Sequence, residues 1–171
     1  GGYQRESMSK PFAAIVMGSD SDLPVMEASF EELRSFGVAF EARITSAGRT
    51  PGVTREYVRD AEHRGCAVFI AAAGMAAHLA GAVSAATVKP VIGVPMNASL
   101  DGLDALLSTA QMPAGIPVAI GKAGAKNAAY LASQILSVAD PALADRLRDE
   151  RAANAEAIAA KDAALQQSLK G

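Results

Sequence analysis

Short apolar runs alternate with amphipathic segments along most of the chain. The runs predict five strands, at residues 12–16, 38–45, 67–72, 90–94 and 116–120. The segments between them predict helices at residues 23–36, 51–64, 103–108 and 128–138, and one more that ends near residue 87. Strands that alternate with helices predict an α/β fold with a parallel sheet that is covered on both faces.

Turn and capping residues predict where these helices begin and end. Asp22 is a candidate N-cap for the first helix, and Gly37 ends it. Thr50 as N-cap and Pro51 at the first helical position predict the start of the second helix, which closes at Gly65.

The loop after the first strand predicts a binding site for an anion. A parallel sheet binds ligands beyond the carboxyl ends of its strands, where helix N-termini present free N–H groups. Gly18 permits a tight turn there, and the hydroxyls of Ser19 and Ser21 can bond phosphate oxygens. Asp20 and Asp22 repel phosphate, so at least one of them is expected to cap the helix or bind a sugar hydroxyl. The alternative is a turn with capping duties only.

The next two loops add an arginine and a histidine at the same edge of the sheet. Arg49 in the second loop fits the other half of a phosphate site, or pairs with a surface carboxylate. His78 in the third loop is a candidate proton carrier, or a packing residue. The two histidines and the single cysteine lie too far apart in the sequence to predict a metal site.

The ends of the chain lie outside the predicted core. Residues 1–7 have the character of a leftover tag before a native start at Met8. Residues 8–140 are expected to form a single α/β domain, and residues 141–171 a C-terminal helical arm. This alanine-rich, polar helix either packs on a neighbouring subunit or is a solvated helix that frays.

Composition excludes several classes of protein. Half of the 171 residues are hydrophobic, which is enough for a core, and the net charge of −2 offers no general attraction to nucleic acid or anionic membranes. No apolar run is long enough to span a membrane. The single cysteine, Cys66, cannot form an internal disulfide, is expected to be buried, and fits a cytoplasmic protein.

Six motifs in a fixed order resemble the PurE family, the N5-carboxyaminoimidazole ribonucleotide mutases of purine biosynthesis. The resemblance covers roughly residues 11 to 150. The motifs are Met17-Gly18-Ser19-Asp20-Ser21-Asp22, Ser46-Ala47-x-Arg49-Thr50-Pro51, Ala73-Gly74-Met75-Ala76-Ala77-His78-Leu79, Val91-Ile92-Gly93-Val94-Pro95, Gln111-Met112-Pro113 and Ile120-Gly121-Lys122-Ala123-Gly124-Ala125-Lys126-Asn127-Ala128.

The resemblance implies a three-layer, flavodoxin-like fold with a five-stranded sheet, and an octamer with active sites at subunit junctions. It implies transfer of a carboxylate from N5 to C4 of an imidazole ribonucleotide, with no metal and no organic cofactor. Ser19, Asp22 and Arg49 would bind the ribose 5-phosphate. The base and the migrating carboxylate would be surrounded by a second set of residues: Ser46, Gly74, Met75, Ala76, His78 and Leu79.

The chain departs from the family pattern at Gly48. The family has a histidine here, which is the expected general acid and base, and glycine cannot transfer a proton. The segment before the fifth strand is also shorter than in relatives, and Ala80 stands where proline is common. The resemblance therefore implies a mutase whose activity is impaired or altered.

Three alternatives follow from the same residues. One is direct carboxylation of aminoimidazole ribonucleotide with carbon dioxide, which the family's other class performs. Another is a divergent or non-catalytic protein that binds a ribonucleotide, and its support is Gly48. A receiver or flavin module is a weak alternative, because Ala72 stands where a receiver needs aspartate and aromatic residues are few.

Overall fold

Five parallel strands form one sheet in the order β2-β1-β3-β4-β5. The structure is a computed structural model that describes residues 10–74, 78–97, 100–121 and 125–171. The strands are β1 (Phe12–Met17), β2 (Phe40–Ile44), β3 (Cys66–Ala73), β4 (Val91–Pro95) and β5 (Ala119–Ile120). The predicted α/β class is confirmed, and the strand order is that of flavodoxin-like folds.

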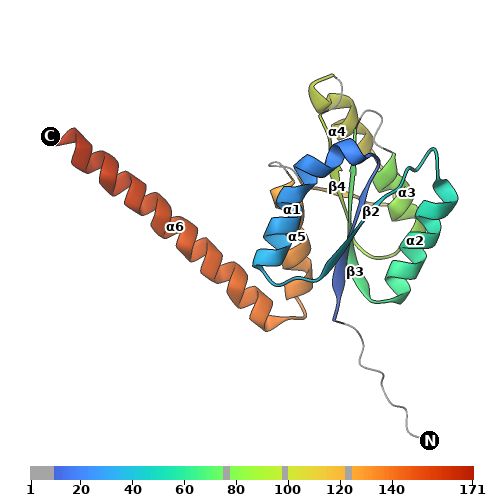
Figure 1. The fold of residues 1–171 in the computed structure, drawn as a ribbon, viewed down its shortest axis with the longest axis horizontal. Helices are drawn as coiled ribbons and strands as arrows, with labels where there is room; N and C mark the ends of the chain where they lie inside the picture. The colour runs from blue at the N-terminus through green and yellow to red at the C-terminus, as the bar shows by residue number, and fades with distance from the viewer. Residues whose placement is uncertain (1–9, 75–77, 98–99, 122–124) are drawn as a thin grey trace, which may run out of the picture.

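Helices cover both faces of the sheet and make three layers. α1 (Leu23–Ser35) and α5 (Lys126–Ser137) lie on one face, and α2 (Pro51–His63) and α3 (Leu79–Ala86) lie on the other (Figure 1). Every residue of β1 is buried, because its side chains point alternately into the two layers. Ile15 packs beneath α1 and α5, whereas Val16 packs with α2 and α3.

The fifth strand is shorter than predicted. Only Ala119 and Ile120 pair with β4, so the prediction of a strand over residues 116–120 is wrong at its start. Pro117 has no N–H group to donate to a ladder, and the N–H of Ile116 donates instead to the carbonyl of Pro113 in a turn. A short 3₁₀ turn (Leu100–Gly102) and α4 (Leu103–Ala110) connect β4 to this segment.

The glycines end helices as predicted, but the two capping side chains do not cap. Gly37 has φ +69° and Gly65 has φ +111°, and each follows a helix end. Asp22 ends the 3₁₀ turn η1 (Asp20–Asp22) and has helical backbone angles. Its carboxylate makes no capping hydrogen bond to the first turn of α1. The hydroxyl of Thr50 bonds the Ser46 backbone instead of capping α2.

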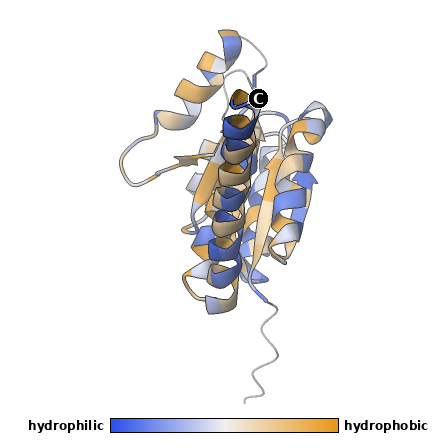
Figure 2. Cartoon of the chain, turned by 90° about the vertical axis from the view of Figure 1, so that its left-hand side faces the viewer, coloured by the Kyte–Doolittle hydropathy of each residue, from blue (hydrophilic) through white to orange (hydrophobic). Residues whose placement is uncertain are grey.

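α6 (Pro141–Leu169) leaves the body of the protein as a long rod (Figure 1). Asp140 caps its start, Leu143 is buried and Leu147 packs on the core. Every residue from Arg151 onward is exposed, and polar and apolar residues are interspersed along the rod (Figure 2). Whether residues 141–171 act as an arm on another subunit stays a prediction.

Candidate functional site

A pocket of about 320 Å³ lies at the carboxyl ends of β1, β2 and β3. This is the point where the strand order reverses, between β1 and β3, and such points are where open α/β sheets bind ligands. The three loops that follow these strands contribute its walls. The lining residues are Gly18, Ser19, Ser21, Asp22, Ser46, Ala47, Gly48, Ala73, Gly74, His78 and Leu79.

The first loop presents two hydroxyl groups to the pocket. Gly18 continues the backbone ladder, because its N–H donates to the carbonyl of Ala72 at 3.0 Å. The Ser19 hydroxyl accepts the N–H of Ser21 at 3.2 Å and lies 2.9 Å from the Ser21 hydroxyl. These bonds are local and exposed, so a phosphate oxygen could replace the contact between the two hydroxyls at little cost.

Asp22 is the buried carboxylate of the pocket. It is 9% exposed, and burial raises its pKa above the ordinary value. The negative charge of Asp20 raises that pKa further, and a backbone hydrogen bond with Ser19 offsets part of the rise. A carboxylate in this state is suited to accepting a hydrogen bond from a sugar hydroxyl or to holding a proton.

The second loop brings Ser46 and Gly48 to the pocket wall and leaves Arg49 beside it. The backbone N–H of Arg49 donates to the Ser46 hydroxyl at 3.0 Å, while its side chain is exposed and does not line the pocket. Among the described residues, no carboxylate pairs with the Arg49 guanidinium. The guanidinium is therefore available to an anion that enters from this side.

Gly48 leaves space where a side chain would stand. No described atom lies within 4 Å of the position that a Cβ would take there, and its φ lies outside the left-handed region. The glycine is therefore not required by the backbone. A Cβ at position 48 is compatible with both the local backbone conformation and the neighbouring described atoms.

The third loop contributes Gly74, His78 and Leu79. Met75 and Ala76, which were also predicted to surround the base, lie outside the described residues. His78 is exposed at the start of α3, where its carbonyl accepts the N–H of Ala82 at 2.9 Å. Asp22 and His78 are the two ionisable side chains among the described residues that line the pocket.

Neither metal ligation nor thiol chemistry finds support in the described part of the chain. It contains no group of three or more potential metal ligands. Cys66 is buried as predicted, and burial raises its pKa to about 11, so it is held as an unreactive thiol. No helix found in the described ranges is long and apolar enough to cross a membrane.

Three lining residues were not singled out from the sequence as site residues. Gly18, Ala47 and Ala73 are small, and their contribution to the pocket is mainly the room that they leave. Gly18 and Ala47 lie in loops that follow parallel strands and Ala73 is the last residue of β3, and that position at the carboxyl end of a strand is the sequence signal that could have identified them.

The chain matches the model of one protein family over most of its length. That family is described as AIR carboxylase, and the match covers residues 13–157. The chain is 53% identical over 143 residues to a Pyrococcus abyssi protein named N5-carboxyaminoimidazole ribonucleotide mutase, and covers 82% of each chain. It is 49% identical over 160 residues to a Mycobacterium tuberculosis protein of the same name, and covers 92% of each.

The fold is also similar to that of a crystal structure of PurE from Treponema denticola. The two chains superpose with a TM-score of 0.84 at 32% sequence identity. The alignment covers 91% of this chain and 98% of the Treponema chain. The resemblance seen in the sequence motifs is confirmed.

Proposed function

The chain belongs to the AIR carboxylase family, and from this we propose that it converts N5-carboxyaminoimidazole ribonucleotide to 4-carboxy-5-aminoimidazole ribonucleotide. The observation that carries the proposal is the pocket at the carboxyl ends of β1, β2 and β3, with an anion-binding loop on one side and His78 on another. The names of relatives that are about half identical over most of the chain support the same reaction.

The reaction exchanges one bond to the carboxylate for another. The N5–carboxylate bond breaks, which leaves bound aminoimidazole ribonucleotide and carbon dioxide, and N5 takes up a proton. C4 then attacks the carbon dioxide, a C4–carbon bond forms, and the proton on C4 leaves. Protons and carboxylate balance, so the pocket needs one group that moves a proton, and neither an oxidant nor a reductant is required.

The residues of the first two loops are assigned to the ribose and its 5-phosphate. Ser19 and Ser21 supply hydroxyls, and Arg49 of the second loop supplies a cation that forms no ion pair with a described residue. Asp22 is assigned to a ribose hydroxyl, because a carboxylate accepts a hydrogen bond from a hydroxyl group and, when ionised, repels phosphate. Ser46, Gly74 and Leu79, together with Met75 and Ala76, are assigned to the base and the carboxylate.

Gly48 weakens the proton-transfer step. In the family pattern a histidine at this position moves the proton, and general acid–base catalysis contributes about 10²–10⁴-fold in rate. His78 lines the same pocket and is assigned as the remaining proton carrier. We therefore expect slow turnover with ordinary affinity for the nucleotide.

Turnover with isotopically labelled carbon dioxide tests this function and separates it from its alternatives. A mutase converts N5-carboxyaminoimidazole ribonucleotide and largely retains its own carboxylate, whereas a carboxylase incorporates label from solution. Tight binding of aminoimidazole ribonucleotide with no conversion at any pH would identify a non-catalytic binding protein, which Gly48 favours as the second candidate. Failure to bind at millimolar ligand would contradict the whole proposal.

Assembly and location are part of the same proposal. We infer a cytoplasmic homo-oligomer, an octamer, in which the exposed C-terminal residues 151–171, most of them in α6, pack on a neighbouring subunit. Light scattering on the full chain and on a chain that ends at Glu150 tests this. A smaller assembly in the truncated chain supports the arm, and an unchanged assembly contradicts it.

A further inference from the structure

Three threonine hydroxyls form a connected chain directly behind the second loop of the pocket. The hydroxyl oxygens of Thr45 and Thr54 lie 2.7 Å apart, and those of Thr45 and Thr50 lie 3.2 Å apart. Thr45 follows β2, Thr50 precedes α2, and Thr54 lies one turn inside α2. The chain of hydroxyls therefore ties the strand before the loop to the helix after it.

Two of these hydroxyls are buried and depend on each other. Thr45 is 5% exposed and Thr54 is 3% exposed. An arrangement in which Thr45 donates to Thr54, and Thr54 donates to the carbonyl of Thr50 at 3.1 Å, satisfies both protons. Removal of one hydroxyl leaves the other with fewer partners in a site that water reaches poorly.

The backbone of Ser46 is the point that this network holds. Its carbonyl accepts the N–H of Thr50 at 2.9 Å and the Thr50 hydroxyl at 3.1 Å, and the Thr54 hydroxyl lies 3.4 Å away. Its N–H donates to the Thr50 hydroxyl at 3.0 Å. The loop is closed at its base, so the segment from Ala47 to Arg49 is presented to the ligand on a fixed support.

The strand side of the network is fixed as well. The N–H of Thr45 donates to the carbonyl of Met17 at 2.8 Å, immediately before Gly18 of the first loop. The two loops therefore share an anchor at the ends of β1 and β2. A displacement of Thr45 would change the separation between Ser46 and the hydroxyls of the first loop.

We propose that Thr45 and Thr54 are positioning residues that set the geometry of the second loop for the nucleotide. Neither side chain lines the pocket, so both act through Ser46 and the residues that follow it. This inference rests on the proposed function, because its ligand is the imidazole ribonucleotide. It gives a role to two buried threonine hydroxyls for which the sequence motifs alone indicate no function.

The test compares variants that remove the hydroxyl with one that keeps it. Thr54→Val preserves shape and loses the hydrogen bonds, and we expect it to weaken aminoimidazole ribonucleotide binding by about 3- to 10-fold. Thr54→Ser keeps the hydroxyl and should bind within about twofold of the unchanged protein. Thr54→Val binding as well as the unchanged protein, or Thr54→Ser binding as weakly as Thr54→Val, would overturn the inference.

A matched control separates positioning from general stability. Thr109 is buried in α4, lies outside the pocket and donates to the carbonyl of Ala105 at 2.7 Å, as Thr54 does to Thr50. Thr109→Val should lower the melting temperature and leave the dissociation constant unchanged. An equal loss of affinity in Thr109→Val would overturn the inference. If Thr54→Val does not fold, Thr45→Val removes the same hydrogen bond between Thr45 and Thr54 by changing the other partner.

A double-mutant cycle measures whether two losses of affinity are additive, and a general loss of stability does not change that result. If Thr54 acts through the second loop, the affinity losses of Thr54→Val and Ser46→Ala are not additive. Additive losses would show that Thr54 acts elsewhere. Failure of the unchanged protein to bind the nucleotide contradicts the proposed function instead, so the two failures are distinguishable.

Discussion

The first and second loops of the pocket use their hydroxyl groups in opposite ways. In the first loop, Ser19 and Ser21 face the pocket and bond mainly to each other and to nearby groups on the surface. In the second loop, Thr45 and Thr54 are buried behind the wall and bond to each other and to the backbone. Hydroxyls of the first kind are free to contact a ligand, and those of the second kind hold the loop in place.

Because of this difference, we expect similar substitutions in the two loops to change ligand affinity and protein stability in different proportions. Loss of an exposed hydroxyl removes a ligand contact and leaves the fold almost unchanged, because water replaces the lost partner. Loss of a buried hydroxyl destabilises the fold and also displaces the loop. The ratio between lost affinity and lost stability therefore reports which role a residue has.

The largest effect on ligand binding is expected at Arg49, the cation beside the pocket. Arg49→Met should weaken aminoimidazole ribonucleotide binding by roughly 10- to 150-fold, since a hydrogen bond to a charged group contributes about 1.5–3 kcal/mol. The melting temperature should hardly change, because the side chain is exposed and makes no ion pair with a described residue. Titration calorimetry measures the dissociation constant, and a thermal melt measures the melting temperature.

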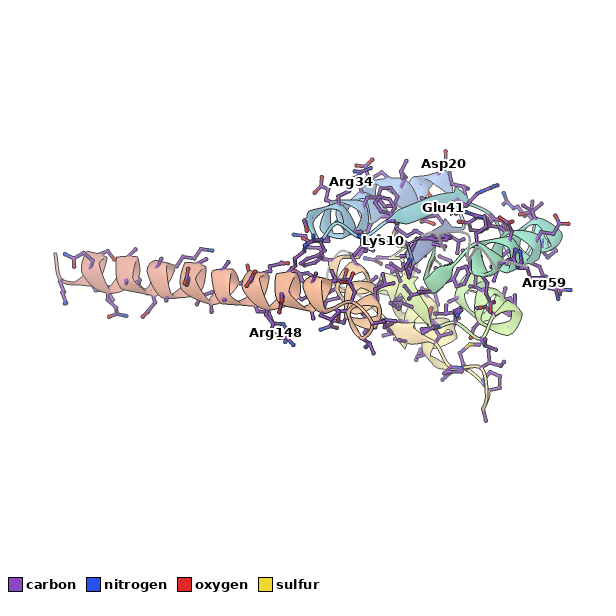
Figure 3. The ribbon with its side chains drawn as sticks, turned by 90° about the horizontal axis from the view of Figure 1, so that it is seen from below. Lys10, Asp20, Arg34, Glu41, Arg59 and Arg148 are labelled. Atoms are coloured by element: carbon purple, nitrogen blue, oxygen red, sulfur yellow. The ribbon has the colours of Figure 1, made fainter. Side chains whose placement is uncertain are left out.

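A matched control for Arg49 lies on the adjacent helix. Arg59 is exposed on α2 (Figure 3) and is not among the residues that line the pocket. Arg59→Met removes the same charge and should leave binding unchanged. Equal losses in the two variants would mean that net charge, and not Arg49 itself, attracts the phosphate.

A smaller effect is expected at Ser19, where the comparison between the loops is sharpest. Ser19→Ala should weaken binding by about 2- to 10-fold, the range of one neutral hydrogen bond. The melting temperature should fall by no more than about 2 °C, because the lost contacts are exposed. Thr54→Val should lower affinity and melting temperature together. A Ser19→Ala protein that melts like Thr54→Val would remove the distinction between the loops.

The smallest effect is a pH-dependent change in stability at Asp22. Burial raises the pKa of Asp22 in the folded protein, so the folded state binds this proton more tightly than the unfolded state. The free energy of unfolding therefore falls as pH rises from the unfolded pKa of about 3.9 through the folded pKa. Asp22→Asn removes this loss and should raise the melting temperature at pH 7.

The gap between Asp22→Asn and the unchanged protein should close below about pH 3.9, where both forms are neutral. Asp20→Asn should give a smaller gain in the same direction, because Asp20 is exposed (Figure 3) and its charge contributes only part of the rise in the pKa of Asp22. A melting-temperature gain that persists at acid pH would show that the benefit does not come from the charge of Asp22.

Much of the fold could be predicted from the hydrophobic pattern. The strands at 12–16, 67–72 and 90–94 are buried on both faces, so their continuous apolar runs identified them within one or two residues. Gly37 ended its helix because only the left-handed conformation fits that position. The convergence of three loops followed from the parallel sheet, and with it the positions of Ser19, Ser46 and His78.

The errors arose where local hydrogen bonds within a loop or turn determine the geometry. Thr50 has the residue type of an N-cap, but its hydroxyl bonds to Ser46 across the loop. Asp22 ends a 3₁₀ turn that the sequence did not reveal, so its backbone is already helical. Thr54 lies on the buried face of α2 with Tyr57 and Val58, and a polar residue on that face was the available signal of a buried network.

The most direct test of the whole account is the mutase turnover of this protein beside that of its Gly48→His variant. The open space at Gly48 and its unstrained backbone accommodate the Cβ that any new side chain needs. We predict that histidine raises turnover by about 10²–10⁴-fold while affinity for aminoimidazole ribonucleotide hardly changes. No gain in turnover, with both proteins still binding the nucleotide, would contradict the claim that this pocket is a mutase site that lacks only the histidine of its second loop.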